Sequence, residues 1–293
     1  MEKIGIIGLG RMGGPIAARL IAAGLDVATH DSRADSGRTV DDAATLAASV
    51  DVLVTVLPGT PELSAVMEAV SLREGGLWLD LTSADPTVAA EIASALAAGG
   101  VESVGAPMGG GPSAAAAGEL SFFVGGGGAS IARIRPILDL LGTTTIMGDD
   151  VTVGYTTKLL ANTLWFGQAV AVAEALLLGQ AQGIDPKRLS DALAASAGGS
   201  VFLSDHLPAL LDGDYLETFG IDRVVEELDS VTGLARRHGT PIELTERVAR
   251  THREALDEFG AINGELLGMK LLEHRAGRLI RSSEPAKSTP SAE

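Results

Sequence analysis

The first 150 residues alternate short apolar runs with segments of helical periodicity. Apolar runs bounded by glycine, proline or aspartate are typical of buried strands. They predict strands over 3–9, 26–31, 51–58, 76–83, 101–107, 119–126 and 143–148. Helices are predicted between them over 13–24, 41–48, 61–70, 86–98 and 129–141. Strands that alternate with helices indicate parallel strands with helices on both faces, a doubly wound sheet.

After about residue 150 the strand pattern disappears. One long apolar helix is predicted over 155–183, and further helices over 186–196, 202–211, 221–238, 241–259 and 263–275. The fold class is therefore α/β: an N-terminal Rossmann-type doubly wound domain, then an all-helical C-terminal domain, linked by the long helix. We expect an NAD(P)-binding domain over 1–150, a helical substrate and oligomerisation domain over 151–280, and a disordered tail over 281–293, which is rich in Ser, Pro and Glu.

Composition narrows the range of partners. The net charge is -16 and the pI is about 4.7, so an acidic surface would repel nucleic acid and anionic membranes. The chain has no cysteine, and its histidines are far apart in sequence, so no metal site is expected. The N-terminus lacks the layout of a signal peptide, which predicts a cytoplasmic protein. The long apolar helix predicts a homodimer or homotetramer, with an intrachain core as the alternative.

The stretch "GLGRMG" lies between the first predicted strand and the first predicted helix. Glycines at these positions let the backbone approach a pyrophosphate, and the helix N-terminus supplies amide donors. The motif predicts a cofactor loop of NAD or NADP. Its residues are Gly8, Leu9, Gly10, Arg11, Met12 and Gly13.

The second predicted strand ends at Asp31, which is followed by Ser32 and Arg33. An acidic residue here accepts hydrogen bonds from the adenine ribose and repels a 2′-phosphate, so Asp31 favours NAD, although Arg33 weakens that preference. Ligands of doubly wound sheets bind beyond the carboxyl ends of the strands. Further cofactor contacts are predicted there, at Leu57, Pro58 and Ser83.

Lys158 is the only charged side chain between Asp150 and Glu174. It shares one helix face with Gly154 and Asn162, at a spacing of i, i+4 and i+8. A lysine in apolar surroundings has a lowered pKa and can exchange a proton with an alcohol or carbonyl oxygen. The alternative is a packed helix whose lysine head reaches the surface.

Three segments together resemble the β-hydroxyacid dehydrogenase family, the 3-hydroxyisobutyrate dehydrogenase-like enzymes. They are "IGIIGLGRMGGPIAARLIAAG", "APMGGGPSAAAAGELSFFVGG" and "GYTTKLLAN". The resemblance covers residues 3–275. It implies a Rossmann domain, a helical C-terminal domain and reversible NAD(P)-linked oxidation of a hydroxyl group. It also implies that Lys158 is the general acid/base, that Asn162 holds the substrate, and that Ser83 lies near the nicotinamide end of the cofactor.

Two positions depart from the family pattern. Gly110 and Gly111 match paired glycines of the substrate loop, but Gly109 stands where the family has a serine. Glu226 stands where the family has a lysine, so the charge is reversed. Both changes remove support for a substrate carboxylate. We therefore expect a substrate that is larger, neutral or cationic, such as an amino alcohol, a ketone or an imine; the alternative is that Glu226 points to solvent.

Two rival functions fit the same motifs. The first is an imine or ketone reductase on the same scaffold, although such imine-reducing relatives often lack the lysine that is retained here. The second is a non-catalytic NAD(P)-sensing protein, against which the pair Lys158 and Asn162 argues. We favour hydride transfer between nicotinamide and a small-molecule hydroxyl or carbonyl substrate.

Overall fold

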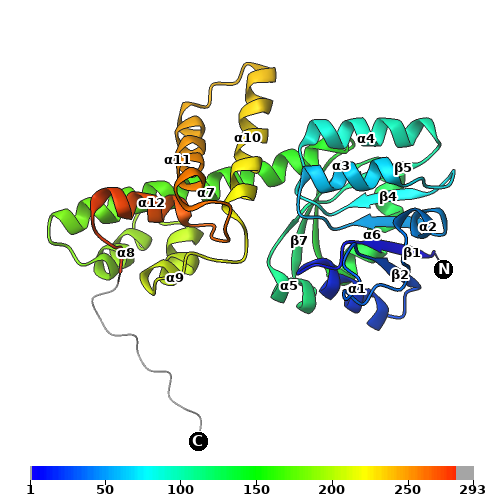
Figure 1. The fold of residues 1–293 in the computed structure, drawn as a ribbon. Coiled ribbons are helices and arrows are strands. Elements are labelled where there is room, and N and C mark those ends of the chain that lie inside the picture. Colours follow the sequence, from blue (N-terminus) through cyan, green and yellow to red (C-terminus); the bar gives the residue numbers. More distant parts are fainter. Residues whose placement is uncertain (1, 282–293) are drawn as a thin grey trace, which may run out of the picture. The chain divides into compact units, whose positions relative to one another are not determined.

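The computed structural model describes residues 2–281, so most of the predicted tail lies outside the described residues. By its contacts the chain divides into two compact units, 1–160 and 161–293. The first holds the sheet, and the helices after α7 (Thr152–Ala181) belong to the second (Figure 1). The expected fold class, a Rossmann-type domain and an all-helical domain with a long helix between them, is confirmed.

Five parallel strands form the centre of the sheet in the order β2-β1-β3-β4-β5. Most of their residues are buried, because helices cover both faces of the sheet; β1, β3 and β4 are buried along their whole length. Their bounds are β1 Ile4–Ile7, β2 Val27–His30, β3 Val52–Thr55, β4 Leu77–Asp80 and β5 Glu102–Gly105.

The far end of the sheet differs from the parallel pattern expected. Strand β7 (Leu120–Gly126) runs antiparallel to β5 and to the short β6 (Met108–Gly109), and parallel to β8 (Gly142–Gly148). Buried parallel and antiparallel strands have the same apolar pattern, so periodicity cannot distinguish them. The sequence patterns also did not predict β6 or the short helix α5 (Pro112–Ala117).

Helices cover both faces of the sheet (Figure 1). On one face α1, α5 and α6 lie together, and on the other α2, α3 and α4. Asp42 and Asp85 accept backbone N–H bonds at the starts of α2 and α4, which explains where these helices begin. The bounds are α1 Gly13–Ala22, α2 Ala43–Ala48, α3 Thr60–Ala69, α4 Pro86–Ala98 and α6 Gly128–Leu141.

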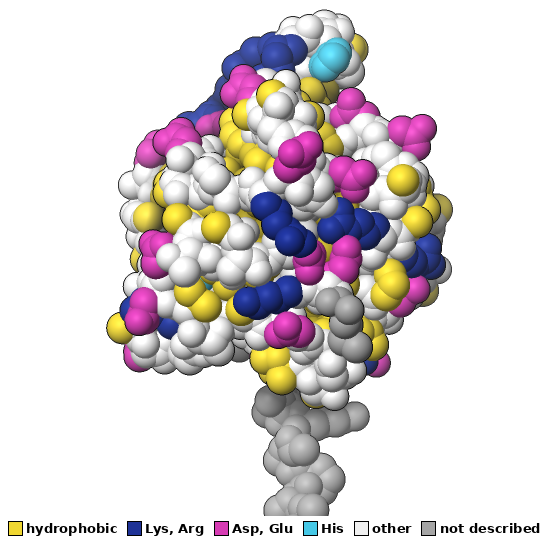
Figure 2. Space-filling model, turned by 90° about the vertical axis from the view of Figure 1, so that its right-hand side faces the viewer, with side chains coloured by type: hydrophobic (Ala, Val, Ile, Leu, Met, Phe, Trp, Pro, Cys, Tyr) yellow, Lys and Arg dark blue, Asp and Glu magenta, His cyan; other side chains and the backbone are white. Residues whose placement is uncertain are grey.

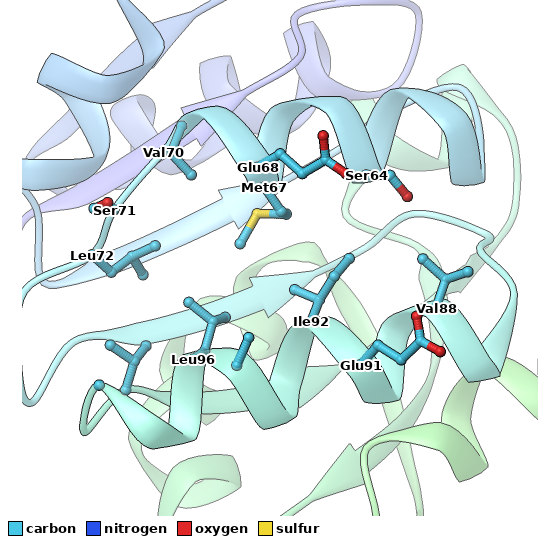
Figure 3. A pocket seen from close by; sticks show the side chains of 13 residues that line it. Ser64, Met67, Glu68, Val70, Ser71, Leu72, Val88, Glu91, Ile92 and Leu96 are labelled. Atoms are coloured by element: carbon cyan, nitrogen blue, oxygen red, sulfur yellow. The ribbon is translucent and has the colours of Figure 1, made fainter.

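A groove of about 500 Å³ lies between α3 and α4 (Figure 3). Its walls are mainly apolar, with Met67, Ile92 and Leu96 pointing into it and the carboxylates of Glu68 and Glu91 beside them. No predicted site residue lines this groove. It is therefore separate from the predicted cofactor loop.

The second unit consists of the rest of α7 and shorter helices packed against it. The expected single helix over 202–211 is instead a π-helical turn followed by an α-helix that has Pro208 in its first turn. The last predicted helix begins later than expected, because 263–266 hydrogen-bond to the segment 215–220. The bounds are α8 Pro186–Ala194, η1 Phe202–His206, α9 Leu207–Leu211, α10 Ile221–His238, α11 Glu243–Phe259 and α12 Leu267–Ala276.

A buried carboxylate fastens the segment that follows α12. Glu273 is 1% exposed and accepts hydrogen bonds from the Ile280 backbone N–H at 2.6 Å and from Tyr215 Oη at 2.6 Å. The Arg281 guanidinium pairs with the same carboxylate at 2.9 Å and also donates to Tyr215 Oη at 2.7 Å. The charge of Glu273 is thus matched by a cation and by two further donors, as a buried carboxylate requires.

Among the described helices, α7 alone is long and apolar enough to cross a membrane by length and composition. Of its most apolar window, 44% is buried inside the protein. Leu164 and Leu178 on the same helix are 66% and 67% exposed. Acidic and basic side chains are interspersed over the face drawn in Figure 2, with apolar side chains between them.

Candidate active site

The glycine-rich turn after β1 has the geometry that dinucleotide binding requires. Gly8 has φ +99°, and a Cβ there would overlap the Val56 carbonyl oxygen; a Cβ at Gly13 would overlap the Gly8 carbonyl oxygen. At Gly10, by contrast, a Cβ would meet no atom within 4 Å. The two outer glycines therefore permit the turn itself, and Gly10 leaves open space beside the start of α1 where a pyrophosphate fits.

Asp31 lies directly after β2 and is tied to the glycine-rich turn. Its Oδ2 accepts from the Leu9 N–H at 2.7 Å, and its Oδ1 accepts from Arg33 N at 2.9 Å and from Arg33 Nε at 3.0 Å. Burial alone would raise the pKa of Asp31, but the hydrogen bonds from Arg33 and Leu9 outweigh it and lower the pKa to about 2. The carboxylate is ionised, and the Arg33 side chain, 59% exposed, is the more accessible partner.

The ends of β3 and β4 lie side by side, because Thr55 pairs with Asp80 in parallel register. The Leu57 N–H donates to Thr82 Oγ1 at 3.1 Å, which fixes the two loops to each other. Leu57 is half-buried and Pro58 is exposed, while Ser83 is partly open to solvent. These predicted cofactor residues and the glycine-rich turn therefore share the carboxyl edge of one parallel sheet.

The first turn of α7 is packed closely against the sheet. A Cβ at Gly154 would overlap the Phe123 carbonyl oxygen and lie 2.9 Å from the Gly105 carbonyl oxygen. The Tyr155 ring is fully buried against Gly105 of β5. Lys158 lies one turn further on and is half-buried. Backbone contact with the sheet fixes the start of this helix, and only glycine at position 154 allows that contact. Lys158 therefore lies on a helix whose first turn is held in place.

A buried carboxylate that the sequence patterns did not single out lies beneath the β4 loop. Asp80 is 0% exposed, and its Oδ1 accepts from Thr55 Oγ1 at 2.6 Å and from Thr82 N at 3.1 Å. Its Oδ2 accepts from Tyr155 Oη at 2.8 Å. Burial raises the pKa of Asp80 to about 6 against these hydrogen bonds, and it raises the pKa of Tyr155 well above its ordinary value. A charged residue inside an apolar strand run was the signal available in the sequence.

The predicted substrate loop follows β6. Gly109 belongs to β6 and pairs with Ser121, Gly110 has φ +103°, and Gly111 precedes the first turn of α5. A Cβ at Gly110 would lie 3.0 Å from Ala114 Cβ, so this turn requires glycine both by conformation and by space. Gly111 is exposed, as is the backbone around Gly110.

In the second unit, Asn162 is bound to a residue that was not predicted. Asn162 Nδ2 donates to Glu227 Oε2 at 2.6 Å, and Glu227 is 6% exposed. The neighbouring Glu226 is half-buried and pairs with Arg223 Nη1 at 2.9 Å, so it does not simply point to solvent. Arg223 and Glu227 lie 61 and 65 positions from Asn162 along the chain, so sequence spacing could not predict a contact with it. Their closeness to the predicted Glu226 on α10 was the available signal.

The described residues contain no group of three His, Asp or Glu side chains that could hold a metal ion. In the first unit Asp31 pairs with Arg33, and Asp80 accepts from Tyr155, which lies three residues before Lys158 on α7. The glycine-rich turn at the edge of a parallel sheet suits a dinucleotide.

Comparison with known proteins covers nearly the whole chain. Residues 3–148 match the family described as the NAD-binding domain of 6-phosphogluconate dehydrogenase. Residues 153–267 match the family described as NAD-binding of NADP-dependent 3-hydroxyisobutyrate dehydrogenase.

Two relatives illustrate the match in sequence. A 3-hydroxyisobutyrate dehydrogenase of Pseudomonas aeruginosa is 33% identical over 221 residues, which are 71% of this chain and 74% of the relative. A 2-(hydroxymethyl)glutarate dehydrogenase of Eubacterium barkeri is 27% identical over 257 residues, 83% of this chain and 85% of the relative.

Two solved structures illustrate the match in fold. The 3-hydroxyisobutyrate dehydrogenase of Mycobacterium tuberculosis with L-serine has a TM-score of 0.85 at 24% identity, covering 93% of this chain and 99% of that one. An imine reductase of Streptomyces aurantiacus has a TM-score of 0.61 at 19% identity, covering 92% and 99%.

The fold, the glycine-rich turn and these matches define an NAD(P)-dependent oxidoreductase that acts on CH–OH groups. The chain belongs to the β-hydroxyacid dehydrogenase family, the 3-hydroxyisobutyrate dehydrogenase-like enzymes. A non-catalytic NAD(P)-sensing role is thereby set aside, and the imine reductases share the scaffold.

Proposed function

We propose that Lys158 is the general acid/base of this dehydrogenase. The supporting observation is its position one turn beyond Gly154 and Tyr155, which hold the start of α7 against β5 and β7. In oxidation, neutral Lys158 accepts the substrate hydroxyl proton; in reduction, protonated Lys158 donates to the carbonyl oxygen. NAD(P), when bound, supplies the hydride chemistry.

The remaining predicted residues are assigned to positioning. Asn162, one turn beyond Lys158 on α7, donates to the substrate oxygen or orients it, and its amide is itself oriented by Glu227. The glycine-rich turn and Ser83 hold the cofactor, and the backbone of Gly109, Gly110 and Gly111 holds the rest of the substrate. We assign residues 1–150 mainly to cofactor binding and residues 151–280 mainly to substrate binding and oligomerisation.

For the substrate, we propose a hydroxyl compound whose second functional group is cationic or neutral. Glu226 replaces a lysine of the family pattern, and its own turn of α10 carries Asp222, Glu226 and Glu227 against Arg223 alone. Carboxylates outnumber the guanidinium there, so a small substrate carboxylate gains no cation from this turn. Arg223 offsets part of the charge of Glu226, which makes a neutral partner group as acceptable as an ammonium.

A panel followed at 340 nm with NAD(H) and NADP(H) tests the substrate class. We expect 3-amino-2-methylpropan-1-ol, in which an aminomethyl group replaces the carboxylate, to be oxidised with a kcat/KM about tenfold above that of 3-hydroxyisobutyrate, with L-serine as a third probe. Glu226→Lys should reverse the order. Asp229→Lys, the same charge change one turn along α10 at an exposed position, is the control and should leave the order unchanged. Preference of the unaltered protein for 3-hydroxyisobutyrate would contradict the proposal.

For the cofactor, we propose that NAD is favoured and that Arg33 supports the remaining activity with NADP. The ionised Asp31 repels a 2′-phosphate, and the exposed Arg33 guanidinium attracts one.

Arg33→Ala should therefore lower kcat/KM for NADP⁺ at least about tenfold and change that for NAD⁺ by less than about threefold, since a charge-assisted phosphate contact is worth more than about 1.4 kcal/mol. Arg135→Ala, which removes an exposed arginine of α6 paired with Asp139, is the matched control. Equal losses with both cofactors would show that Arg33 only stabilises the turn.

We propose a homodimer or homotetramer in the cytoplasm. The exposed Leu164 and Leu178 of α7, with the exposed Ala171 and Ala175 between them, form an apolar stripe that a second copy would cover. A particle of monomer mass in solution would contradict this assembly.

A further inference from the structure

We infer that Tyr155 and Asp80 are positioning residues, a buried tether that holds the helix carrying Lys158 at a fixed place beside the β4 loop. The inference rests on the proposed role of Lys158. It adds two residues that the general acid/base assignment does not contain. All three lie in the first unit.

The tether joins two elements that are far apart in the chain. Tyr155 lies in the first turn of α7, and Asp80 is the last residue of β4, 75 positions earlier. Their hydrogen bond, Tyr155 Oη to Asp80 Oδ2 at 2.8 Å, is fully buried. Lys158 is three residues beyond Tyr155, so any rotation of the first turn about the α7 axis moves its side chain.

The other oxygen of Asp80 fixes the opposite end of the tether. Oδ1 accepts from Thr82 N and from Thr55 Oγ1, and Thr55 Oγ1 in turn accepts from Trp78 Nε1 at 2.9 Å. Thr82 also binds Leu57 N–H, so the carboxylate is connected to the loops after β3 and β4. These loops carry Leu57 and Ser83, which we assign to the cofactor.

Apolar and backbone contacts set how closely the start of α7 packs on the sheet. Gly154 packs against the backbone of β5 and β7, and the Tyr155 ring packs against Gly105 of β5. These contacts fix the distance between α7 and the sheet. Among the described residues, the hydrogen bond from Tyr155 to Asp80 gives this buried turn a directional link to β4. A misplacement of about 1 Å of a catalytic group is enough to reduce turnover by up to about a hundredfold.

Tyr155→Phe tests the tether because it removes one hydroxyl and keeps the ring. The matched control is Thr55→Val, which removes a donor to the same carboxylate without touching α7. Tyr155→Phe loses one buried hydrogen bond and Thr55→Val loses two, because Trp78 Nε1 also donates to Thr55 Oγ1, so both variants should unfold at lower temperature. Only Tyr155→Phe should lower kcat, by about tenfold, with the KM for NAD⁺ unchanged, and only it should speed amide hydrogen exchange at 152–158 by about tenfold.

A double-mutant cycle compares Tyr155→Phe, Asp80→Asn and the double variant Tyr155→Phe/Asp80→Asn. The kcat of each is measured with 3-amino-2-methylpropan-1-ol, 3-hydroxyisobutyrate and L-serine. If the two groups act through their bond, the double variant should be no slower than the slower single variant. Equal kcat losses in Tyr155→Phe and Thr55→Val, or an unchanged kcat in Tyr155→Phe, would overturn the inference. Lys158→Ala is assayed in parallel: its normal turnover would reject the proposed function itself, whereas an inactive Lys158→Ala with a normal Tyr155→Phe rejects the tether alone.

Discussion

Replacing Lys158 with alanine is expected to lower kcat by a factor of about 10² to 10⁴, the range that general acid/base groups contribute. Without the amine, the hydroxyl proton has no acceptor on α7 as hydride leaves. Binding of NADH, followed by its fluorescence, should persist, because the glycine-rich turn and Asp31 follow β1 and β2 and are not part of α7. The loss would therefore appear in kcat rather than in cofactor affinity.

Two further variants show whether the amine or only its charge is needed. Lys158→Arg keeps a cation but cannot release a proton near neutral pH, so it should be as slow in oxidation as the alanine variant. Lys187→Ala removes a different lysine, exposed on α8 and paired with Asp191, and should leave kcat unchanged. Turnover near the unaltered level in Lys158→Ala would end the assignment.

The second large effect concerns stability: between pH 6.5 and pH 4, acid should stabilise the first unit through Asp80 and destabilise the second unit through His252. In the first unit, burial raises the pKa of Asp80 from 3.8 to about 6. In the second, burial of His252 outweighs its hydrogen bond to the Val248 carbonyl and lowers its pKa from 6.5 to about 4. Each shift corresponds to about 3 kcal/mol of unfolding free energy.

The signs follow from which state binds the proton more tightly. Folded Asp80 holds its proton better than the unfolded chain, so its contribution rises as the pH falls from 6 to 4 and is lost as the pH rises through 6. His252 binds a proton below pH 6.5 in the unfolded chain but only near pH 4 in the folded protein. The free energy of unfolding therefore decreases as the pH falls from 6.5 to 4. Tyr155 is the titratable group that contacts Asp80, and Asp31, with its pKa of about 2, acts only below this window.

Asp80→Asn and His252→Gln separate the two contributions. The difference in unfolding free energy between Asp80→Asn and the unaltered protein should change in favour of the variant by about 2 kcal/mol as the pH rises from 4 to 6. For His252→Gln it should move in favour of the variant by a similar amount as the pH falls from 6.5 to 4. Urea unfolding at both pH values, with hydrogen exchange to locate each unit, measures this. Parallel pH curves for all three proteins would contradict both assignments.

Local sequence patterns were enough to predict the fold and to name candidate site residues that lie close together in the chain. The glycine-rich turn, Asp31 with Arg33, and Gly154 with Lys158 are each separated by a few residues, so spacing alone brought them together. The strands were predicted because buried runs between turn residues leave little choice. The antiparallel direction of β7 was not, because it depends on the path of residues 106–119 and not on the apolar pattern.

The partners that were not predicted lie far apart in sequence. Tyr155 meets Asp80 across 75 positions, and Asn162 meets Glu227 across 65. Such pairs are decided by which strand or helix lies next to which, and a single sequence contains no record of that. The ion pair of Glu226 with Arg223 is a different case, because the two residues are three positions apart on α10 and their spacing was available in the sequence.

The bonds that Glu273 makes with Ile280 and Arg281 limit where the chain can be truncated. Because Ile280 and Arg281 supply two of the groups that satisfy this buried carboxylate, a truncation at the end of α12 would strip it of its cation and of a backbone donor. A recombinant chain that keeps Glu273 satisfied therefore has to extend at least through Arg281. A fusion that replaces the chain from Ile280 onward would remove both groups.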